Sequence, residues 1–206
     1  MQILVVTGGI GSGKSEVCRL LAEKGLPAQY NADAKVKELY DTVPGLLDSI
    51  EEKLGCRLRD DSGRFTPGSL AQRIFTDRTA LEDVEAIVFP ALMDDFRMFA
   101  ARSAEKIVIF ESATILEKPQ FDGFADKVIL VDAPVQTRLE RACMRDGTDK
   151  EKVMARMANQ KLMNAISEGT VDPRVDAVVI NDGTLDTLSE RIEKVMSDLF
   201  GDWRRI

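Results

Sequence analysis

The stretch "VVTGGIGSGKSEV", residues 5–17, joins an apolar run to four glycines, a lysine and a serine. Within it, residues 8–15, "GGIGSGKS", fit the pattern G-x-x-x-x-G-K-[ST] between a predicted strand and a predicted helix. Glycines let backbone N–H groups turn inward as an anion-binding nest, and the N-terminus of the next helix adds partial positive charge. Such a phosphate-binding loop, or P-loop, is typical of proteins that bind a nucleoside triphosphate.

A glycine-rich turn without a ligand and a dinucleotide-binding turn are the alternatives for this loop. Lys14 places a cation where the β- and γ-phosphates would lie, and Ser15 supplies an oxygen ligand for Mg²⁺, neither of which a dinucleotide site needs. The sequence contains no N-K-x-D segment, which would indicate guanine, and no LSGGQ transporter signature. We therefore expect a small kinase that uses ATP and Mg²⁺. The predicted ATP contacts in the loop are Gly8, Gly9, Ile10, Gly11, Ser12, Gly13, Lys14, Ser15 and Glu16.

The rest of the chain predicts an α/β fold around this loop. Continuous apolar runs alternate along the chain with segments that have helical periodicity. Such runs are typical of strands that are buried on both faces of a parallel sheet. The predicted helices are 14–24, 135–145 and 185–199, and the predicted strands are 3–7, 26–31, 106–111, 127–132 and 176–181. These elements predict a P-loop NTPase core with a five-stranded parallel sheet flanked by helices.

A long helical stretch, residues 34–105, separates the second predicted strand from the third. A parallel crossover needs only one helix, so we expect an inserted helical subdomain, with a longer crossover as the alternative. The stretch leaves the sheet at the edge where open α/β sheets bind ligands, which favours a substrate-covering role. Residues 1–33 and 106–206 would then form the nucleotide-binding core.

Composition excludes several classes of site. The net charge of −7 disfavours binding to nucleic acid, and the absence of histidine excludes histidine-dependent triads, zinc sites and general bases. Three scattered cysteines predict reduced thiols, and no apolar run approaches the roughly 18 residues of a membrane span. We expect a cytoplasmic protein with no membrane contact and a carboxylate as its general base. The oligomeric state cannot be predicted from the sequence.

Two carboxylates, one just past a predicted strand and one at the end of another, lie at the edge from which the loop projects. Asp33 could orient an acceptor hydroxyl or accept its proton; alternatively it caps the next helix. Glu111 stands where the Walker-B acid of such enzymes holds Mg²⁺, so Ser15 and Glu111 are the predicted metal ligands. An exposed carboxylate at a strand end is the alternative for Glu111.

Three arginines, Arg138, Arg141 and Arg145, recur three and four residues apart and share one face of a predicted helix. A solvated basic face is one interpretation of this stripe. The other places Arg141 and Arg145 in a lid, where a guanidinium neutralises charge on the transferring phosphoryl group.

Beyond the loop, the chain resembles the dephospho-CoA kinases, which catalyse the last step of coenzyme A synthesis. Order and spacing carry the resemblance along nearly the whole chain. The matching segments are "TGGIGSGKS" at 7–15, "NADAKVKEL" at 31–39, "VEAIVFPAL" at 84–92, "APVQTRLERACMRDG" at 133–147, Gln160 and "DAVVINDG" at 176–183. The chain departs from the family pattern at Asn31, Glu16 and Phe89, which replace Asp, Thr and His, and at "ESATILE", residues 111–117.

The resemblance implies transfer of the ATP γ-phosphate to the ribose 3′-hydroxyl of dephospho-CoA, giving coenzyme A and ADP. It also implies a helical CoA-binding domain and a lid near residues 141–155. It makes Asp33, Lys14 and Arg141 catalytic and adds Lys37 as a contact to dephospho-CoA. Asn181 would border the adenine, with a plain strand-end turn as the alternative. The competing functions are a kinase for a nucleoside, nucleotide or shikimate, and a regulatory ATP-binding protein that has lost catalysis.

Overall fold

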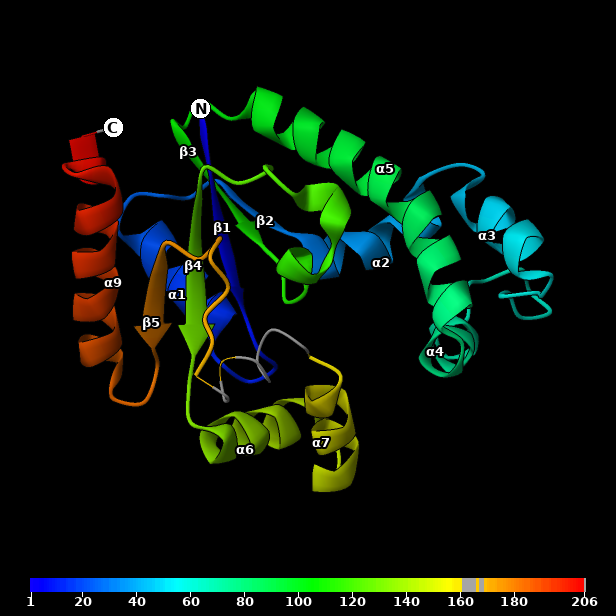
Figure 1. Cartoon of the computed structure of the whole chain (residues 1–206). Coiled ribbons are helices and arrows are strands. Elements are labelled where there is room, and N and C mark those ends of the chain that lie inside the picture. The colour runs from blue at the N-terminus through cyan, green and yellow to red at the C-terminus, as the bar shows by residue number, and fades with distance from the viewer. Residues whose placement is uncertain (161–165, 167–168, 206) are drawn as a thin grey trace. The chain divides into compact units, whose positions relative to one another are not determined.

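The computed structural model describes residues 1–160, 166 and 169–205, and its centre is a five-stranded sheet (Figure 1). All pairings are parallel, and the strand order is β2-β3-β1-β4-β5. The strands are β1 (Gln2–Gly8), β2 (Gln29–Asn31), β3 (Ile107–Glu111), β4 (Lys127–Asp132) and β5 (Ala177–Ile180). This architecture confirms the predicted α/β class and the parallel sheet.

Strand register brings the candidate site residues to one edge of the sheet. In the centre, β1 pairs with β3 and β4, and Gly8 lies opposite Val131. On β2, Asn31 lies directly opposite Glu111 of β3. Because the carboxyl ends of parallel strands share an edge, the end of β1 and the side chains of Asn31 and Glu111 face the same region.

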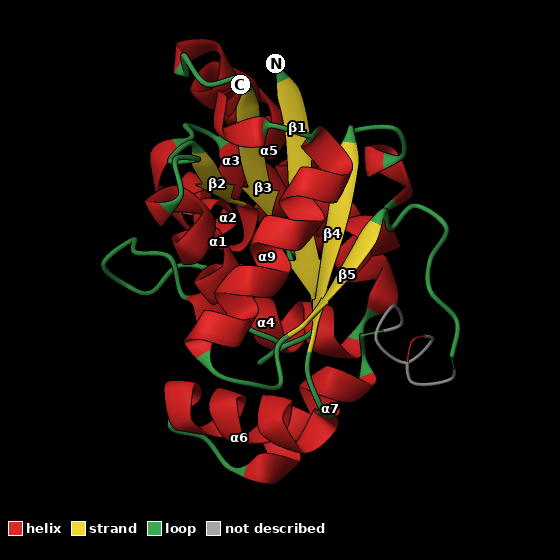
Figure 2. Cartoon of the chain, turned by 90° about the vertical axis from the view of Figure 1, so that its left-hand side faces the viewer, coloured by secondary structure: helices red, strands yellow, loops and turns green. Residues whose placement is uncertain are grey.

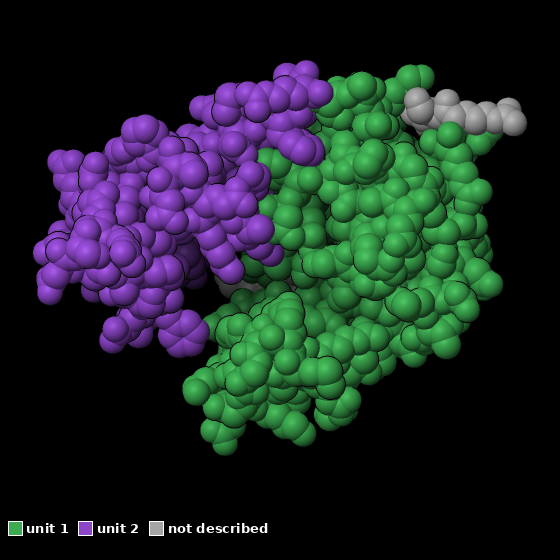
Figure 3. Space-filling model, turned by 180° about the vertical axis from the view of Figure 1, so that it is seen from behind, with its two compact units in different colours: residues 1–31, 103–206 green, residues 32–102 purple. Residues whose placement is uncertain are grey.

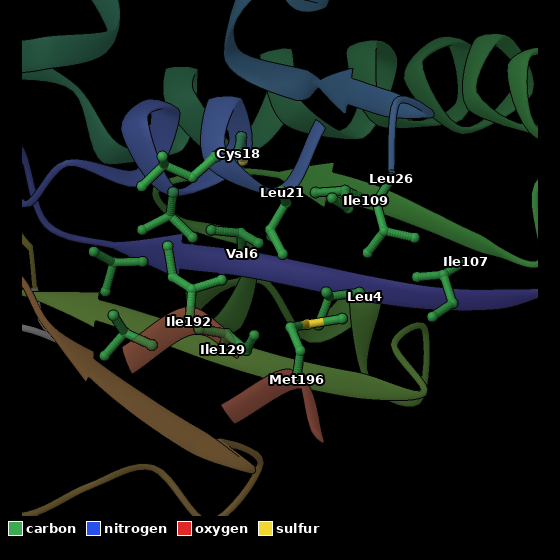
Figure 4. Close-up of a cluster of buried hydrophobic side chains, with 14 of the residues drawn as sticks. Leu4, Val6, Cys18, Leu21, Leu26, Ile107, Ile109, Ile129, Ile192 and Met196 are labelled. Carbon is green, nitrogen blue, oxygen red and sulfur yellow. The ribbon is translucent and has the colours of Figure 1, made fainter. Parts of the chain in front are cut away.

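Two helices, α1 (Lys14–Glu23) and α9 (Leu185–Phe200), share a hydrophobic core with the sheet (Figure 4). Figure 2 shows α9 in front of the sheet, covering one of its faces. Its fully buried residues Leu188, Ile192 and Met196 recur every four positions, which is the spacing of one helix face. Each such side chain contributes about 1.5–3 kcal/mol by leaving water, so this face fixes α9 to the sheet.

Beyond the carboxyl ends of the strands lies a helix pair, α6 (Val135–Asp146) and α7 (Lys150–Ala158) (Figure 1). Gly147 ends α6 in the left-handed conformation, and the Asp149 side chain caps α7 by accepting from the N–H of Lys152. The pair has a small apolar core of its own, formed by Leu139, Ala142, Val153 and Met157. Single 3₁₀ turns, η1 (Ile115–Glu117), η2 (Pro119–Phe121) and η3 (Trp203–Arg205), complete the described elements of this part.

Residues 32–102 form a second compact unit, coloured separately in Figure 3 from residues 1–31 and 103–206. It consists of α2 (Ala32–Thr42), α3 (Leu46–Leu54), α4 (Pro67–Thr76) and α5 (Arg78–Arg102). The three shorter helices contact α5, whose buried side chains lie strictly four residues apart. These side chains are Ala80, Val84, Val88, Leu92, Phe96 and Ala100.

Element boundaries differ from the sequence predictions at the second strand. The predicted strand 26–31 is shorter in the structure and begins only at Gln29. Pro27 has no N–H to give to a ladder, which explains the late start. The helix after this strand begins at Ala32, earlier than the predicted insert at 34, so Asp33 lies inside it.

Candidate active site

The loop between β1 and α1 is closely enclosed by other parts of the chain. Gly11 and Gly13 have φ angles of 75° and 98°, in the left-handed region that favours glycine. A Cβ on Gly11 would lie 2.1 Å from the carbonyl oxygen of Arg138, and one on Gly13 would lie 2.1 Å from Nδ2 of Asn181. Both conformation and space therefore require glycine at these two positions.

Lys14 is held across the loop that precedes it. Its Nζ donates to the carbonyl oxygens of Gly8 at 2.9 Å and Gly9 at 3.3 Å. Helix α1 begins at Lys14 after Gly13, which has no side chain to cap the first N–H groups. The loop thus presents an ammonium group and the positive end of a helix, which together suit a polyphosphate.

Beside the loop, a carboxylate is held by two donors from different elements. Glu111 accepts from Oγ of Ser15 at 2.7 Å through Oε1 and from Nδ2 of Asn31 at 2.8 Å through Oε2. Its residue is only 7% exposed, so the interpretation of Glu111 as an exposed strand-end acid is wrong. Burial, and next the negative charge of Glu111, raise the pKa of the neighbouring Cys18 thiol and keep it protonated.

Asn181 contacts the loop, and Arg141 in turn contacts Asn181. The Asn181 side chain is buried and donates to the carbonyl oxygen of Ser12 at 2.9 Å. Arg141 donates through Nη1 to the carbonyl oxygen of Asn181 at 3.2 Å. Asn181 is therefore more than part of a strand-end turn, since its amide fixes the shape of the loop; a contact with adenine stays a prediction.

The three arginines of the α6 stripe have different environments. Arg138 is only 3% exposed, so the stripe is not a solvated face at this position. Its Nε donates to the carbonyl oxygen of Ile10 at 3.2 Å, and Nη1 lies 3.7 Å from Oδ1 of Asp132. Burial lowers the pKa of Arg138, and Asp132 opposes part of that change. At the other end of the helix, Arg145 is exposed and bonded to Asp146.

Two predicted contacts, Asp33 and Lys37, belong to α2 in the second compact unit. Asp33 is the second residue of α2, so the alternative that makes it the helix N-cap is wrong. In the first turn, its carboxylate still interacts favourably with the helix dipole. Two residues of extended chain span at most about 7 Å, so the Cα atom of Asp33 lies within that distance of the Cα atom of Asn31. Lys37 lies one helical turn further along α2.

Known proteins supply a family for this arrangement. The sequence model of the family described as dephospho-CoA kinase matches residues 2–187. This chain belongs to the dephospho-CoA kinase family. It is therefore a kinase, and ATP use follows from that membership.

Individual relatives and solved structures are similar to this chain over most of its length. A dephospho-CoA kinase of Porphyromonas gingivalis is 35% identical over 175 residues, which cover 85% of each chain. The crystal structure of TT1252 from Thermus thermophilus is similar with a TM-score of 0.81 and 28% identity, covering 97% of this chain and 98% of that one. A dephospho-CoA kinase from Campylobacter jejuni, 19% identical over 96% of this chain and 97% of its own, has a TM-score of 0.56 and shares the fold.

Sequence reasoning missed three contacts at the site. Gln160 accepts from the N–H of Ile10 at 2.8 Å, Arg138 is a buried part of the loop wall, and Asn31 orients Glu111. The signals were the place of Gln160 in the family pattern, the departure of Asn31 from that pattern and the spacing of Arg138 in the arginine stripe.

No helix in the described part of the chain has both the length and the apolar character needed to cross a membrane.

Proposed function

We propose that this dephospho-CoA kinase family member transfers the γ-phosphate of ATP to the ribose 3′-hydroxyl of dephospho-CoA. The observation that carries the proposal is the cluster of Lys14, Ser15 and Glu111 at the P-loop of a chain from this family. It combines a cation for the phosphates with two oxygen ligands for a metal. Phosphoryl transfer depends mainly on positioning and charge stabilisation, and this cluster offers both.

The proposed magnesium site uses Ser15 and Glu111. Their side chains are hydrogen-bonded to each other, and hydroxyl and carboxylate oxygens are ligands that Mg²⁺ prefers. The described residues contain no cluster of three or more His, Cys, Asp or Glu side chains that could hold a metal. Phosphate oxygens and water would complete the coordination, as is usual for this ion. Bound Mg²⁺ would neutralise charge on the phosphates.

Three further residues complete the proposal for ATP and catalysis. Asp33 would accept or orient the proton of the acceptor hydroxyl, a role left to a carboxylate because the chain contains no histidine. Arg141 would neutralise charge on the transferring phosphoryl group from a lid formed by the end of α6 and by α7. Asn181 would border the adenine.

The helical unit is the proposed site for the body of dephospho-CoA. Lys37 of α2 offers a positive charge to a substrate phosphate, and the unit as a whole would cover the acceptor.

Glu16 and Arg145 are the weakest of the proposed ATP contacts. Each is bonded to an oppositely charged neighbour: Glu16 to Arg19, and Arg145 to Asp146. A cytoplasmic location is part of the same proposal, since all three cysteines are free.

Mass spectrometry of an acceptor panel tests the proposed reaction. The protein is incubated with Mg-ATP and dephospho-CoA, adenosine, a nucleoside monophosphate or shikimate. We expect one phosphate to be added to dephospho-CoA, with adenosine a much poorer acceptor because remote binding energy is lost. A preference for the monophosphate or for shikimate would contradict the proposal.

The role of Asp33 is tested by its amide variant. Asp33→Asn should lower kcat by roughly 10²-fold while leaving ATP affinity unchanged, because the amide cannot accept the proton. Asp41→Asn, on the same helix, is the matched control and should retain wild-type turnover. Unchanged turnover in a folded Asp33→Asn protein would leave Asp33 with only its favourable place in the first turn.

A further inference from the structure

Two side chains from distant parts of the chain bind the backbone of Ile10 in the loop. Its N–H donates to Oε1 of Gln160 at 2.8 Å, and its carbonyl oxygen accepts from Nε of Arg138 at 3.2 Å. These partners lie 150 and 128 positions away in the sequence. Both are buried, with exposures of 5% for Gln160 and 3% for Arg138, so water cannot easily replace either bond.

Gln160 determines where the carbonyl of Gly9 points. The N–H and C=O groups of a trans peptide point in opposite directions, and this chain contains no cis peptide among its described residues. With the Ile10 N–H turned to Gln160, the Gly9 carbonyl points into the loop. There it accepts from Nζ of Lys14 at 3.3 Å and from the N–H of Ser12 at 3.1 Å. Gln160 therefore supports the position of Lys14 through one peptide group.

Arg138 acts on the next peptide group in the same way. It binds the carbonyl of Ile10, so the N–H of Gly11 points away from α6. The Arg138 guanidinium lies 3.7 Å from Oδ1 of Asp132, and Gly11 packs directly on the Arg138 backbone. An anion-binding nest needs backbone N–H groups that point into the loop.

Apolar packing ties the same residue to the helix pair α6–α7. The Ile10 side chain packs against the apolar core of the pair, which consists of Leu139, Ala142, Val153 and Met157. The loop is thus joined to α6 by the Arg138 hydrogen bond and the Gly11 contact, to the core of the helix pair by the Ile10 side chain, and to Gln160, two residues beyond the end of α7, by a second hydrogen bond. A shift of these helices would disturb the loop, since packed interiors do not deform continuously.

We infer that Gln160 and Arg138 are positioning residues for ATP binding, which lock two consecutive peptide groups of the P-loop and join that loop to α6–α7. Neither side chain needs to touch the nucleotide for this role. The inference goes beyond the proposed reaction, because it concerns how the loop is prepared for phosphate and holds for any acceptor.

Variants of Gln160 test the inference and leave in place the Arg138 cation beside Asp132, which a change at Arg138 would remove. Gln160→Leu keeps an apolar stem but removes the acceptor, whereas Gln160→Glu keeps an acceptor oxygen. Gln136→Leu is the matched control, since Gln136 lies on the exposed face of α6 and bonds to Glu140. The readouts are the Kd for a non-hydrolysable Mg-ATP analogue by calorimetry and hydrogen exchange of the peptide that contains Ile10.

Gln160→Leu should weaken nucleotide binding roughly 10-fold and speed exchange of the Ile10 amide, as expected for a lost buried hydrogen bond. Gln160→Glu should restore binding to within about 3-fold of wild type. Gln136→Leu should match wild type in both readouts. A purely structural role would reduce the folded fraction and leave the Kd of the folded molecules unchanged. That result, or equal loss in the Leu and Glu variants, would overturn the inference.

Two features keep the test decisive. If Gln160→Leu does not fold, exchange in the wild-type protein decides: a protected Ile10 amide supports the inference, and one that exchanges at the rate of an open loop contradicts it. The binding assay contains no dephospho-CoA or other phosphate acceptor. Failure of dephospho-CoA turnover would therefore count against the proposed function and not against this inference.

Discussion

Arg138 and Arg145 lie two turns apart on the same face of α6, yet one is buried and the other is in water. Arg138 is 3% exposed and is held by Ile10 and Asp132 beside the P-loop. The side chain of Arg145 is 63% exposed and bonds to Asp146, which also binds Arg156 of α7. The inner end of the helix is part of the loop wall, and the outer end is a solvated ion-pair network.

The difference shows that surroundings, not residue type, determine the contribution of a charge. Removing one partner of a buried ion pair costs about 3–5 kcal/mol, because the other charge is left uncompensated. Exposed pairs contribute about 0–1 kcal/mol and are screened by salt. Changes at the loop and the inner end of α6 should therefore have much larger effects than changes at the outer end.

The largest effect is expected at the loop itself. Lys14→Ala should lower kcat by roughly 10³-fold, because it removes a preorganised charge that stabilises the transferring phosphoryl group. Steady-state kinetics with dephospho-CoA and Mg-ATP measure this. Lys194→Ala, at an exposed position of α9, is the control and should retain kcat. Near-normal turnover of Lys14→Ala would show that the loop lysine does not stabilise the transferring phosphoryl group.

Arg138→Met should destabilise the protein by about 1–3 kcal/mol, because the carbonyl of Ile10 would lose its buried donor and Asp132 would lose the cation beside it. Arg145→Met should change stability by less than about 1 kcal/mol. Urea unfolding of both variants gives the comparison directly. Equal free energies of unfolding for the two variants would abolish the distinction between the ends of the helix.

Between the two ends, Arg141→Lys should lower kcat about 10-fold while the protein stays folded. Lysine keeps the charge but loses the planar fork that can bond to Asn181 and to a phosphoryl group together. Arg145→Lys, one turn further out, serves as the control and should have the smaller effect. If Arg141→Ala keeps full activity, the proposed lid role is wrong.

The smallest effect concerns pH at the outer end. Hydrogen bonds from Arg145 and then from Arg156 hold the pKa of Asp146 well below its ordinary value. Because the folded pKa is depressed, this stabilisation is fully present above about pH 4, the ordinary range of aspartate, and is lost as the pH falls below it. The Tm difference between wild type and Asp146→Asn should therefore be constant from pH 8 to 5 and shrink in more acidic solution. A difference that grows on acidification would contradict the ion-pair account.

Sequence patterns predicted local features and missed those that depend on distant packing. The P-loop and the buried strands could be predicted because motif spacing and apolar runs are local properties of the chain. The bond from Ile10 to Gln160 joins residues 150 positions apart and depends on strand order and on the docking of α6–α7. Burial of Arg138 could not be read from a three-and-four spacing, which describes one helix face but not what covers it.

Asp33 and Glu111 show the same limit at single residues. The sequence identified both as acids at or just after strand ends, but it did not determine whether each carboxylate would be exposed, buried or part of a helix. The helix begins two residues earlier than the cap interpretation needs, which places Asp33 inside α2. Glu111 is buried because Ser15 and Asn31, from two other elements, supply the donors that a buried carboxylate requires.

The position of the transferred phosphate tests the central claim most directly. Wild-type protein is incubated with Mg-ATP and dephospho-CoA, and the product is analysed by phosphorus NMR together with its mass. The account predicts a single new monophosphate on the ribose 3′-oxygen and one ADP for each coenzyme A formed. Phosphate at any other position, or ATP binding with no phosphorylated dephospho-CoA, would contradict it.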